Sequence, residues 1–330
     1  MTRLAQAVVS LAAAALPATT RERYREQWFA DLRDAHELGL SEGAVARGAV
    51  GFALIAVPRE VLRAEFRASF GLVSILATVA VVALPLLEML LRHGFLTGTS
   101  TAPSNAGVFA TAVDGFVPLL FPVLLMLVGC FRLFQELGDR FVANTRTRVR
   151  VESYVYAKLL VAMSVGFVVF FAATFLAFVT AFVIWPAIGN PGVDATGLLI
   201  NGHPWQAEDE FRQYTYSQLL AAGPMPFGLF YSAWVGLGAA TCVALGMACL
   251  LLAKRPVIGL AMPFLLLVAQ HAAVILLGQD RLSVINSLFP FGYTQVPVLV
   301  GMTPLLVLIV AVAGLWVVLL RRLATLETLT

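Results

Sequence analysis

Six long apolar stretches dominate this chain of 330 residues and limit what it can fold into. They lie near residues 71–91, 115–131, 159–185, 227–253, 257–277 and 298–320. An α-helix of about 20 apolar residues crosses the hydrocarbon core of a bilayer, which is about 30 Å thick. Buried helices of soluble proteins rarely stay uncharged over such a length. The sequence therefore predicts an all-α, polytopic membrane protein with six transmembrane helices.

The loops between these stretches alternate in charge, and the alternation predicts the orientation. Arg and Lys accumulate in the short loops on the cytoplasmic side of a membrane protein. The basic residues follow the second, fourth and sixth stretches: Arg132, Arg140, Arg146, Arg148, Arg150, Lys158, Lys254, Arg255, Arg321 and Arg322. The loop after the third stretch is acidic instead, with Asp194, Glu208, Asp209 and Glu210 against Arg212. We therefore expect both termini in the cytoplasm and a multi-pass chain in the cytoplasmic (inner or plasma) membrane.

The first 20 residues have some features of a secretory signal, namely Arg3, an apolar run through Leu16 and small residues after it. Cleavage there would place eight arginines between residues 21 and 67 outside, and it would invert the charge pattern of every later loop. The charge rule thus favours an uncleaved cytoplasmic and interfacial helical prefix at 1–69. A six-span domain at 70–322 and a short cytoplasmic tail at 323–330 would follow.

The prefix contains a charged helical stretch with an apolar face. Thr19 and Glu22 have the spacing of a capping box at its start. Tyr24, Trp28 and Leu32 then recur every four residues and share one side of the helix. This face can dock on a partner or on the rest of the chain, and the sequence leaves both interpretations open.

Two more segments separate this helix from the first span. Residues 44–57 are apolar but too short to cross a membrane, so we expect them at the membrane surface or against the first helix. From residue 59 to residue 67, charged and apolar residues alternate. That pattern predicts an interfacial helix before the first span.

The loop at 133–158 is longer and more charged than a turn between two spans requires. Its first apolar residues fall at helical spacing, and Arg146, Arg148 and Arg150 follow them. Such a segment can lie under the membrane and offer a charged surface to a soluble partner. Alternatively, the arginines only enforce orientation and attract anionic lipid headgroups, at about 1 kcal/mol each. The residues alone leave both interpretations open.

The loop contains the segments FQELG, from Phe134, and RVESYVYAKLL, from Arg150. With these segments it resembles the loop of type-2 ATP-binding-cassette exporter permeases. In that family an acidic residue at the inner end of the second helix precedes a turn and a basic or polar patch, and a tyrosine and a lysine open the third helix. The six-span layout over about residues 59–322 is similar as well. The segment RERYREQWFADL from Arg21 resembles the prefix of some bacterial permeases and of membrane proteins that accompany PadR-type regulators.

The resemblance implies that the loop at 133–158 is the coupling helix, on which a separate cytoplasmic ATPase subunit pushes. The residues implied in that contact are Glu136, Asp139, Arg140, Arg146, Arg148 and Arg150. ATP would bind to the partner, because Lys158 and Lys254 are the only lysines and neither lies in a phosphate-loop motif.

The resemblance also implies that a second permease chain, identical or not, completes a pathway for an amphipathic substrate such as a lipid, a drug-like compound or a peptide. The alternative function is a non-transporting membrane sensor or regulatory protein whose prefix binds a cytoplasmic partner.

Few strongly polar residues lie within the apolar stretches. Glu88 precedes Arg92 by four residues near the outer end of the first stretch, which is the spacing of an ion pair on a helix. Gln270 and His271 lie in the outer half of the fifth stretch. These two residues either bond to a neighbouring helix or line a transport pathway.

Other patterns concern packing and the external side. Gly238, Cys242 and Gly246 recur every four residues in the fourth stretch, which predicts close helix approach. The external loop at 186–224 includes an acidic, helix-like part at 206–220. The segment at 281–297 is apolar but broken by prolines, and short re-entrant helices occur at this place in the family that the chain resembles.

Several kinds of site are not indicated. The three cysteines lack the spacing of zinc ligands, and the four histidines are scattered over different parts of the chain. No nucleophile motif such as G-x-S-x-G occurs. The net charge of +3 is explained by the basic loops. We therefore expect no catalytic or metal site, no cofactor in this chain, no enzymatic activity of its own and no nucleic-acid partner.

Overall fold

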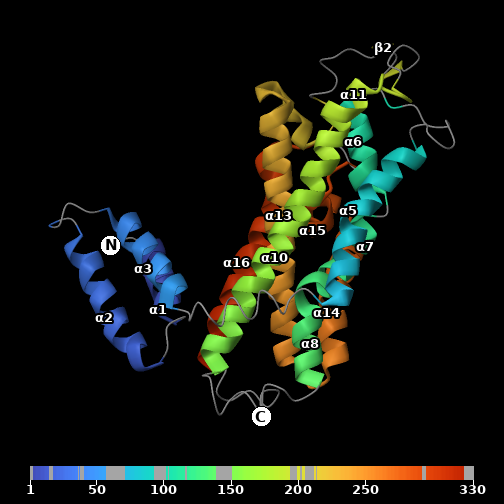
Figure 1. Cartoon of the computed structure of the whole chain (residues 1–330). Helices are drawn as coiled ribbons and strands as arrows, with labels where there is room; N and C mark the ends of the chain where they lie inside the picture. The colour runs from blue at the N-terminus through green and yellow to red at the C-terminus, as the bar shows by residue number, and fades with distance from the viewer. Residues whose placement is uncertain are drawn as a thin grey trace.

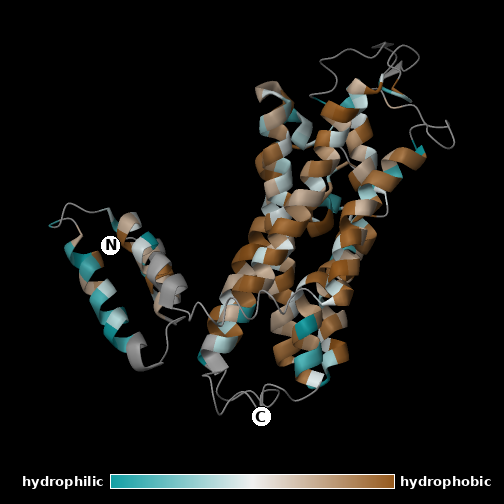
Figure 2. Ribbon diagram, in the orientation of Figure 1, coloured by the Kyte–Doolittle hydropathy of each residue, from teal (hydrophilic) through white to brown (hydrophobic). Residues whose placement is uncertain are grey.

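The computed structural model describes residues 3–14, 18–35, 37, 41–56, 71–92, 102, 104–115, 117–138, 151–193, 199–200, 203–204, 212, 214–291 and 295–322. Six of the helices in these residues are long and apolar enough to cross a membrane, which confirms the predicted helical, six-span fold. Figure 1 shows them as one bundle, with a smaller group of three helices beside it. In Figure 2 the bundle is mostly hydrophobic, whereas one helix of the small group carries many hydrophilic residues.

The six spans are built from ten segments. The first is α5 (Leu72–Arg92). The second joins α7 (Val117–Leu125), a π-helical turn η1 (Met126–Cys130) and α8 (Phe131–Gly138). The third joins α10 (Val151–Val179), a π-helical turn η2 (Thr180–Ile184) and α11 (Trp185–Ala187). The others are α13 (Pro224–Leu252), α14 (Pro256–Leu276) and α16 (Val298–Arg322).

Four spans begin and end within a few residues of the predicted bounds, but the second and third are longer than predicted. The second helix continues past residue 131 to Gly138, and the third begins at Val151 rather than at residue 159. Charged residues in these extensions pair with one another between the two helices. The apolar pattern therefore ends before the helices do.

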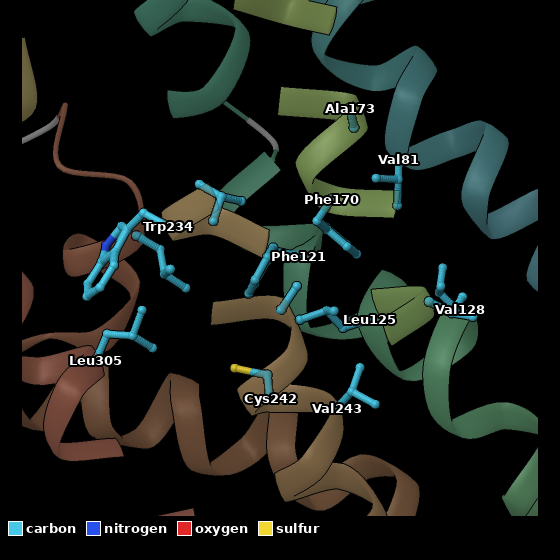
Figure 3. Close-up of a cluster of buried hydrophobic side chains, with 14 of the residues drawn as sticks. Val81, Phe121, Leu125, Val128, Phe170, Ala173, Trp234, Cys242, Val243 and Leu305 are labelled. Carbon is cyan, nitrogen blue, oxygen red and sulfur yellow. The ribbon is translucent and has the colours of Figure 1, made fainter. Parts of the chain in front are cut away.

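Helix α13 lies at the centre of the bundle. Of its apolar window, 83% is buried, against 17% for α14. Glycines let it approach the second span closely: a Cβ added to Gly246 would lie 2.6 Å from Met126 Sδ, and one added to Gly129 would lie 2.6 Å from Val243 Cγ2. This confirms the close approach predicted for the fourth stretch. Figure 3 shows Cys242 and Val243 among the buried side chains of the neighbouring spans.

The prefix helices α1 (Arg3–Ala14), α2 (Ala18–Asp34) and α3 (Glu42–Ala56) form their own small core. Trp28 and Leu32 of α2 are buried against α1 and α3. The apolar face of α2 thus packs on the chain's own helices. This agrees with the interpretation that the face docks on the rest of the chain. Helix α2 begins at Ala18, so Thr19 is a helical residue and not the predicted cap. The predicted interfacial helix at 59–67 lies outside the described residues.

Short helices and strands lie at the end of the bundle that is predicted to be external. Helix α6 (Asn105–Asp114), which was not predicted, places Phe109 in edge-on contact with Phe178, Phe227, Tyr231 and Phe291. Strands β1 (Leu199–Ile200) and β2 (His203–Pro204) form a two-residue antiparallel pair.

Within the predicted acidic helix at 206–220, the structure describes residues 212 and 214–220. A 3₁₀ helix, η4 (Tyr216–Ala222), begins there. A second 3₁₀ turn, η5 (Asp280–Leu282), and the short helix α15 (Val284–Leu288) join α14 to α16.

Aromatic donors hold α15 within the bundle. Tyr216 Oη and Trp234 Nε1 donate hydrogen bonds to the Ser287 carbonyl at 2.8 and 2.9 Å. Tyr231 Oη donates to the Leu288 carbonyl at 2.7 Å. Backbone groups within a membrane protein must be satisfied by the protein itself, and these bonds satisfy the carbonyls at the end of a broken helix.

Candidate functional site

A cluster of charged side chains is buried between the second and third spans. Glu136 of α8 and Lys158 of α10 are 8% and 5% exposed. Lys158 Nζ and Tyr154 Oη both donate hydrogen bonds to Glu136 Oε2. Arg132 Nε lies 3.0 Å from the other carboxylate oxygen, although the Arg132 side chain is 42% exposed. We call Arg132, Glu136, Tyr154 and Lys158 the Glu136 cluster.

Helical spacing explains how these four side chains meet. Arg132 and Glu136 are four residues apart on α8, and Tyr154 and Lys158 are four residues apart on α10, so each pair shares one face of its helix. Lys158 Nζ lies 5.0 Å from the centre of the Tyr154 ring, which is within the range of a cation–π contact. The two helices therefore face each other with complementary charge.

Because the Glu136 cluster is buried, we expect it to hold α8 and α10 rigidly together. Removing an ion from water costs several kcal/mol, and the cost is offset only when opposite charges and hydrogen bonds are well placed. Glu136 receives opposite charges from both helices, and it accepts hydrogen bonds from Tyr154 and Lys158 of α10. The cluster thus ties α8, close to its end at Gly138, to the first turns of α10, which begins at Val151. These two ends flank residues 139–150.

The predicted coupling residues fall into two groups. Glu136 lies in the cluster, whereas Asp139, Arg140, Arg146, Arg148 and Arg150 lie outside the described residues. Sequence reasoning did not select Arg132, Tyr154 or Lys158 for this site. The signals that point to them are the two four-residue spacings and the position of Lys158, which is one of only two lysines in the chain.

A π-helical turn lies in the second span, next to α8. Such turns leave a carbonyl without its usual helical partner and are frequent at functional sites. In η1 the Leu127 carbonyl accepts a hydrogen bond from Ser74 Oγ of α5 at 3.2 Å. Cys130 Sγ lies 3.5 Å from the Val243 carbonyl of α13. The second span thus has an irregular turn close to the Glu136 cluster.

Gln270 and His271 of α14 both bond to the connector that follows their helix. Gln270 Nε2 donates to the Leu282 carbonyl at 2.7 Å, and its Oε1 accepts from the Val284 amide at 3.2 Å. His271 Nδ1 lies 2.7 Å from Ser283 Oγ, and Ser283 is also the N-cap of α15. These contacts fit the interpretation that the two residues bond to neighbouring structure. Their place in a transport pathway stays a prediction.

Replacing Gln270 by alanine is expected to loosen the connector, because the Leu282 carbonyl and the Val284 amide both lose a partner. Each lost hydrogen bond costs about 1 kcal/mol, so the two together should make amide hydrogen exchange over residues 280–288 roughly thirtyfold faster. The exposed side chain of Gln279 provides the control, since Gln279→Ala should leave that exchange unchanged. Equal exchange in both variants would contradict the role of Gln270.

The predicted ion pair near the outer end of the first span is present. Arg92 Nη2 lies 2.8 Å from Glu88 Oε1, and Glu88 is buried. Just outside the spans, desolvation raises the pKa of Asp114, while the positive charge of Arg92 partly lowers it. Desolvation and the negative charge of Asp114 raise the pKa of Tyr214 to about 12. Tyr214 therefore carries no charge at neutral pH.

Comparisons with known proteins identify no relative: no family model, curated protein or solved structure matches this chain. Among the described residues, no three His, Cys, Asp or Glu side chains lie close enough together to hold a metal ion. Among the polar clusters of the described residues, the Glu136 cluster contains the most charged groups in a buried position.

Proposed function

We propose that the chain is the permease subunit of an ATP-binding-cassette exporter, driven by a separate cytoplasmic ATPase subunit. The observation that carries the proposal is the Glu136 cluster. It joins the two helix ends that flank residues 139–150, the segment where the predicted contact arginines lie. A force on that segment would reach both helices at once.

The proposed mechanism uses this connection between α8 and α10. The ATPase subunit binds and hydrolyses ATP and pushes on the segment at 139–150. The Glu136 cluster passes the movement to α8 and α10, and η1 gives the second span a place to bend. Two permease chains would then alternate between inward-facing and outward-facing states and move an amphipathic substrate. In this scheme the chain itself supplies no catalytic residue.

The sensor hypothesis receives less support from the structure. It requires a prefix surface that is open to a cytoplasmic partner, and the apolar face of α2 was the candidate. Trp28 and Leu32 on that face are 7% and 2% exposed, because α1 and α3 cover them. No other contact of the described prefix residues favours a sensor over a permease.

Reversing Arg146, Arg148 and Arg150 together to Glu should abolish co-purification of the ATPase subunit. The reason is electrostatic, because three attractive charges in the predicted contact become repulsive. A matched control reverses Lys254 and Arg255, which lie in a different basic loop, and it should retain the ATPase. The orientation of both variants must be checked by cysteine labelling, since these charges also orient the chain. Unchanged co-purification in a correctly oriented triple variant would refute the coupling assignment.

A further inference from the structure

A cavity of about 320 Å³ lies between the prefix and three of the spans. Val8 and Ala12 of α1 and Val50 of α3 form one wall. Helices α10, α13 and α16 form the others, with Leu159, Ala313 and Trp316 among the lining residues. The volume falls within the range of small-molecule sites, which is about 300–1,000 Å³. The cavity is therefore large enough to hold part of a lipid.

The chemistry of the lining selects an apolar occupant. Thr241 Oγ1 donates to the Leu237 carbonyl at 2.8 Å, and Trp316 Nε1 donates to the Ala244 carbonyl at 2.9 Å, so both donors are used within the protein. Apart from these two side chains, the polar group in the lining is the hydroxyl of Tyr156. Apolar cavities exclude water and accept apolar molecules.

The position of the cavity fits one leaflet of a bilayer. Tyr156 lies near the start of α10 and Leu320 near the end of α16, and both helix ends are predicted to face the cytoplasm. From Leu320 the lining extends along α16 to Ile309, which is about 17 Å at 1.5 Å per residue. Half of a hydrocarbon core is about 15 Å. Tyr156 lies just before the predicted start of the third span at residue 159, close to the interface where aromatic side chains gather in membrane proteins.

We propose that this cavity holds one acyl chain of a phospholipid from the cytoplasmic leaflet. The acyl chain fills the space between α1, α3, α10, α13 and α16. The Tyr156 hydroxyl lies at the level of the lipid ester groups, and the exposed Arg321 lies at the level of the anionic headgroup. The bound lipid thereby joins the prefix to the spans. The inference depends on the membrane placement of the spans and not on the transport function.

The test narrows the cavity with a single substitution. Ala313 and Ala311 are both exposed alanines of α16, but only Ala313 lines the cavity. Each chain is purified in mild detergent, and bound phospholipid is counted by native mass spectrometry. We expect about one retained phospholipid in the original chain and in Ala311→Phe, and at least fivefold less in Ala313→Phe. Equal retention in all three proteins would overturn the proposal.

A second measurement locates the lipid independently of stability. The full chain is placed in vesicles of phosphatidylethanolamine and phosphatidylglycerol, with a phosphatidylglycerol that carries a diazirine at the end of one acyl chain. We expect the label on peptides that include Met163 or Ile309, at the deep end of the cavity, and loss of that label in Ala313→Phe. Labelling confined to other membrane-facing helices would overturn the site. Labelling of Met163 or Ile309 by a diazirine fatty acid but not by the phospholipid would overturn the choice of ligand.

Discussion

Replacing Glu136 by alanine is expected to destabilise the folded chain by about 3–5 kcal/mol. The substitution leaves the ammonium group of Lys158 buried next to Tyr154 without the carboxylate that now compensates it. A buried charge that loses its partner pays the cost of desolvation without the gain of pairing. Unfolding in detergent, followed by circular dichroism, measures the loss.

Two further variants show whether the loss comes from the pair. The double variant Glu136→Gln with Lys158→Met removes both charges, and it should recover most of the stability. Glu22→Ala is the control for an exposed ion pair, because Glu22 lies 3.7 Å from Arg25 and its side chain is 71% exposed. It should change stability by about 0.5 kcal/mol or less. The single variants Glu136→Gln and Lys158→Met are measured as well. If the double variant loses as much stability as these two losses added together, Glu136 and Lys158 are not coupled.

Replacing Gly246 by leucine is expected to cost about 3 kcal/mol or to prevent folding. A Cβ at this position would lie 2.6 Å from Met126 Sδ and 2.8 Å from Cys130 Sγ, so the second span would have to move away from α13. Because both sulfur atoms belong to η1, the movement would also disturb the π-helical turn.

Gly314→Leu is the matched control, since no atom lies within 4 Å of a Cβ at Gly314. Thermal unfolding of the purified chain should separate the two variants, with Gly314→Leu close to the original protein. If Gly246→Leu is as stable as Gly314→Leu, the close packing of α13 on η1 does not contribute to the fold.

The six spans could be predicted because membrane insertion acts on each stretch by itself. About 20 uncharged residues must cross the bilayer whatever their neighbours do. The close packing at Gly246 was also predictable, because small residues at four-residue spacing allow helices to approach. Both features are local in the sequence.

Other features depend on contacts between distant segments and were not predicted. Phe109 of α6 is buried by rings from three other parts of the chain. The π-helical turn η1 has no signature in its residues and is accompanied by the bond from Ser74 to the Leu127 carbonyl.

The candidate site was predicted only in part. Glu136 was selected because the resemblance places an acidic residue at the inner end of the second helix, next to the coupling contact. Its partners were not selected, because a lysine at the start of an apolar stretch also fits a simple orientation signal. The structure shows that Lys158 points to Glu136 and is buried with it. Pairing across two helices is a tertiary property, and a single sequence contains no direct record of it.

If a separate ATPase drives this chain, the ATPase should be isolated together with it. The tagged protein is purified in mild detergent from its own host, and proteins present in equal amount are identified. We predict a partner that carries a phosphate-loop motif and whose ATP hydrolysis changes when the complex forms. Recovery of a regulator without an ATPase, or of the chain with no partner at all, would contradict the permease function.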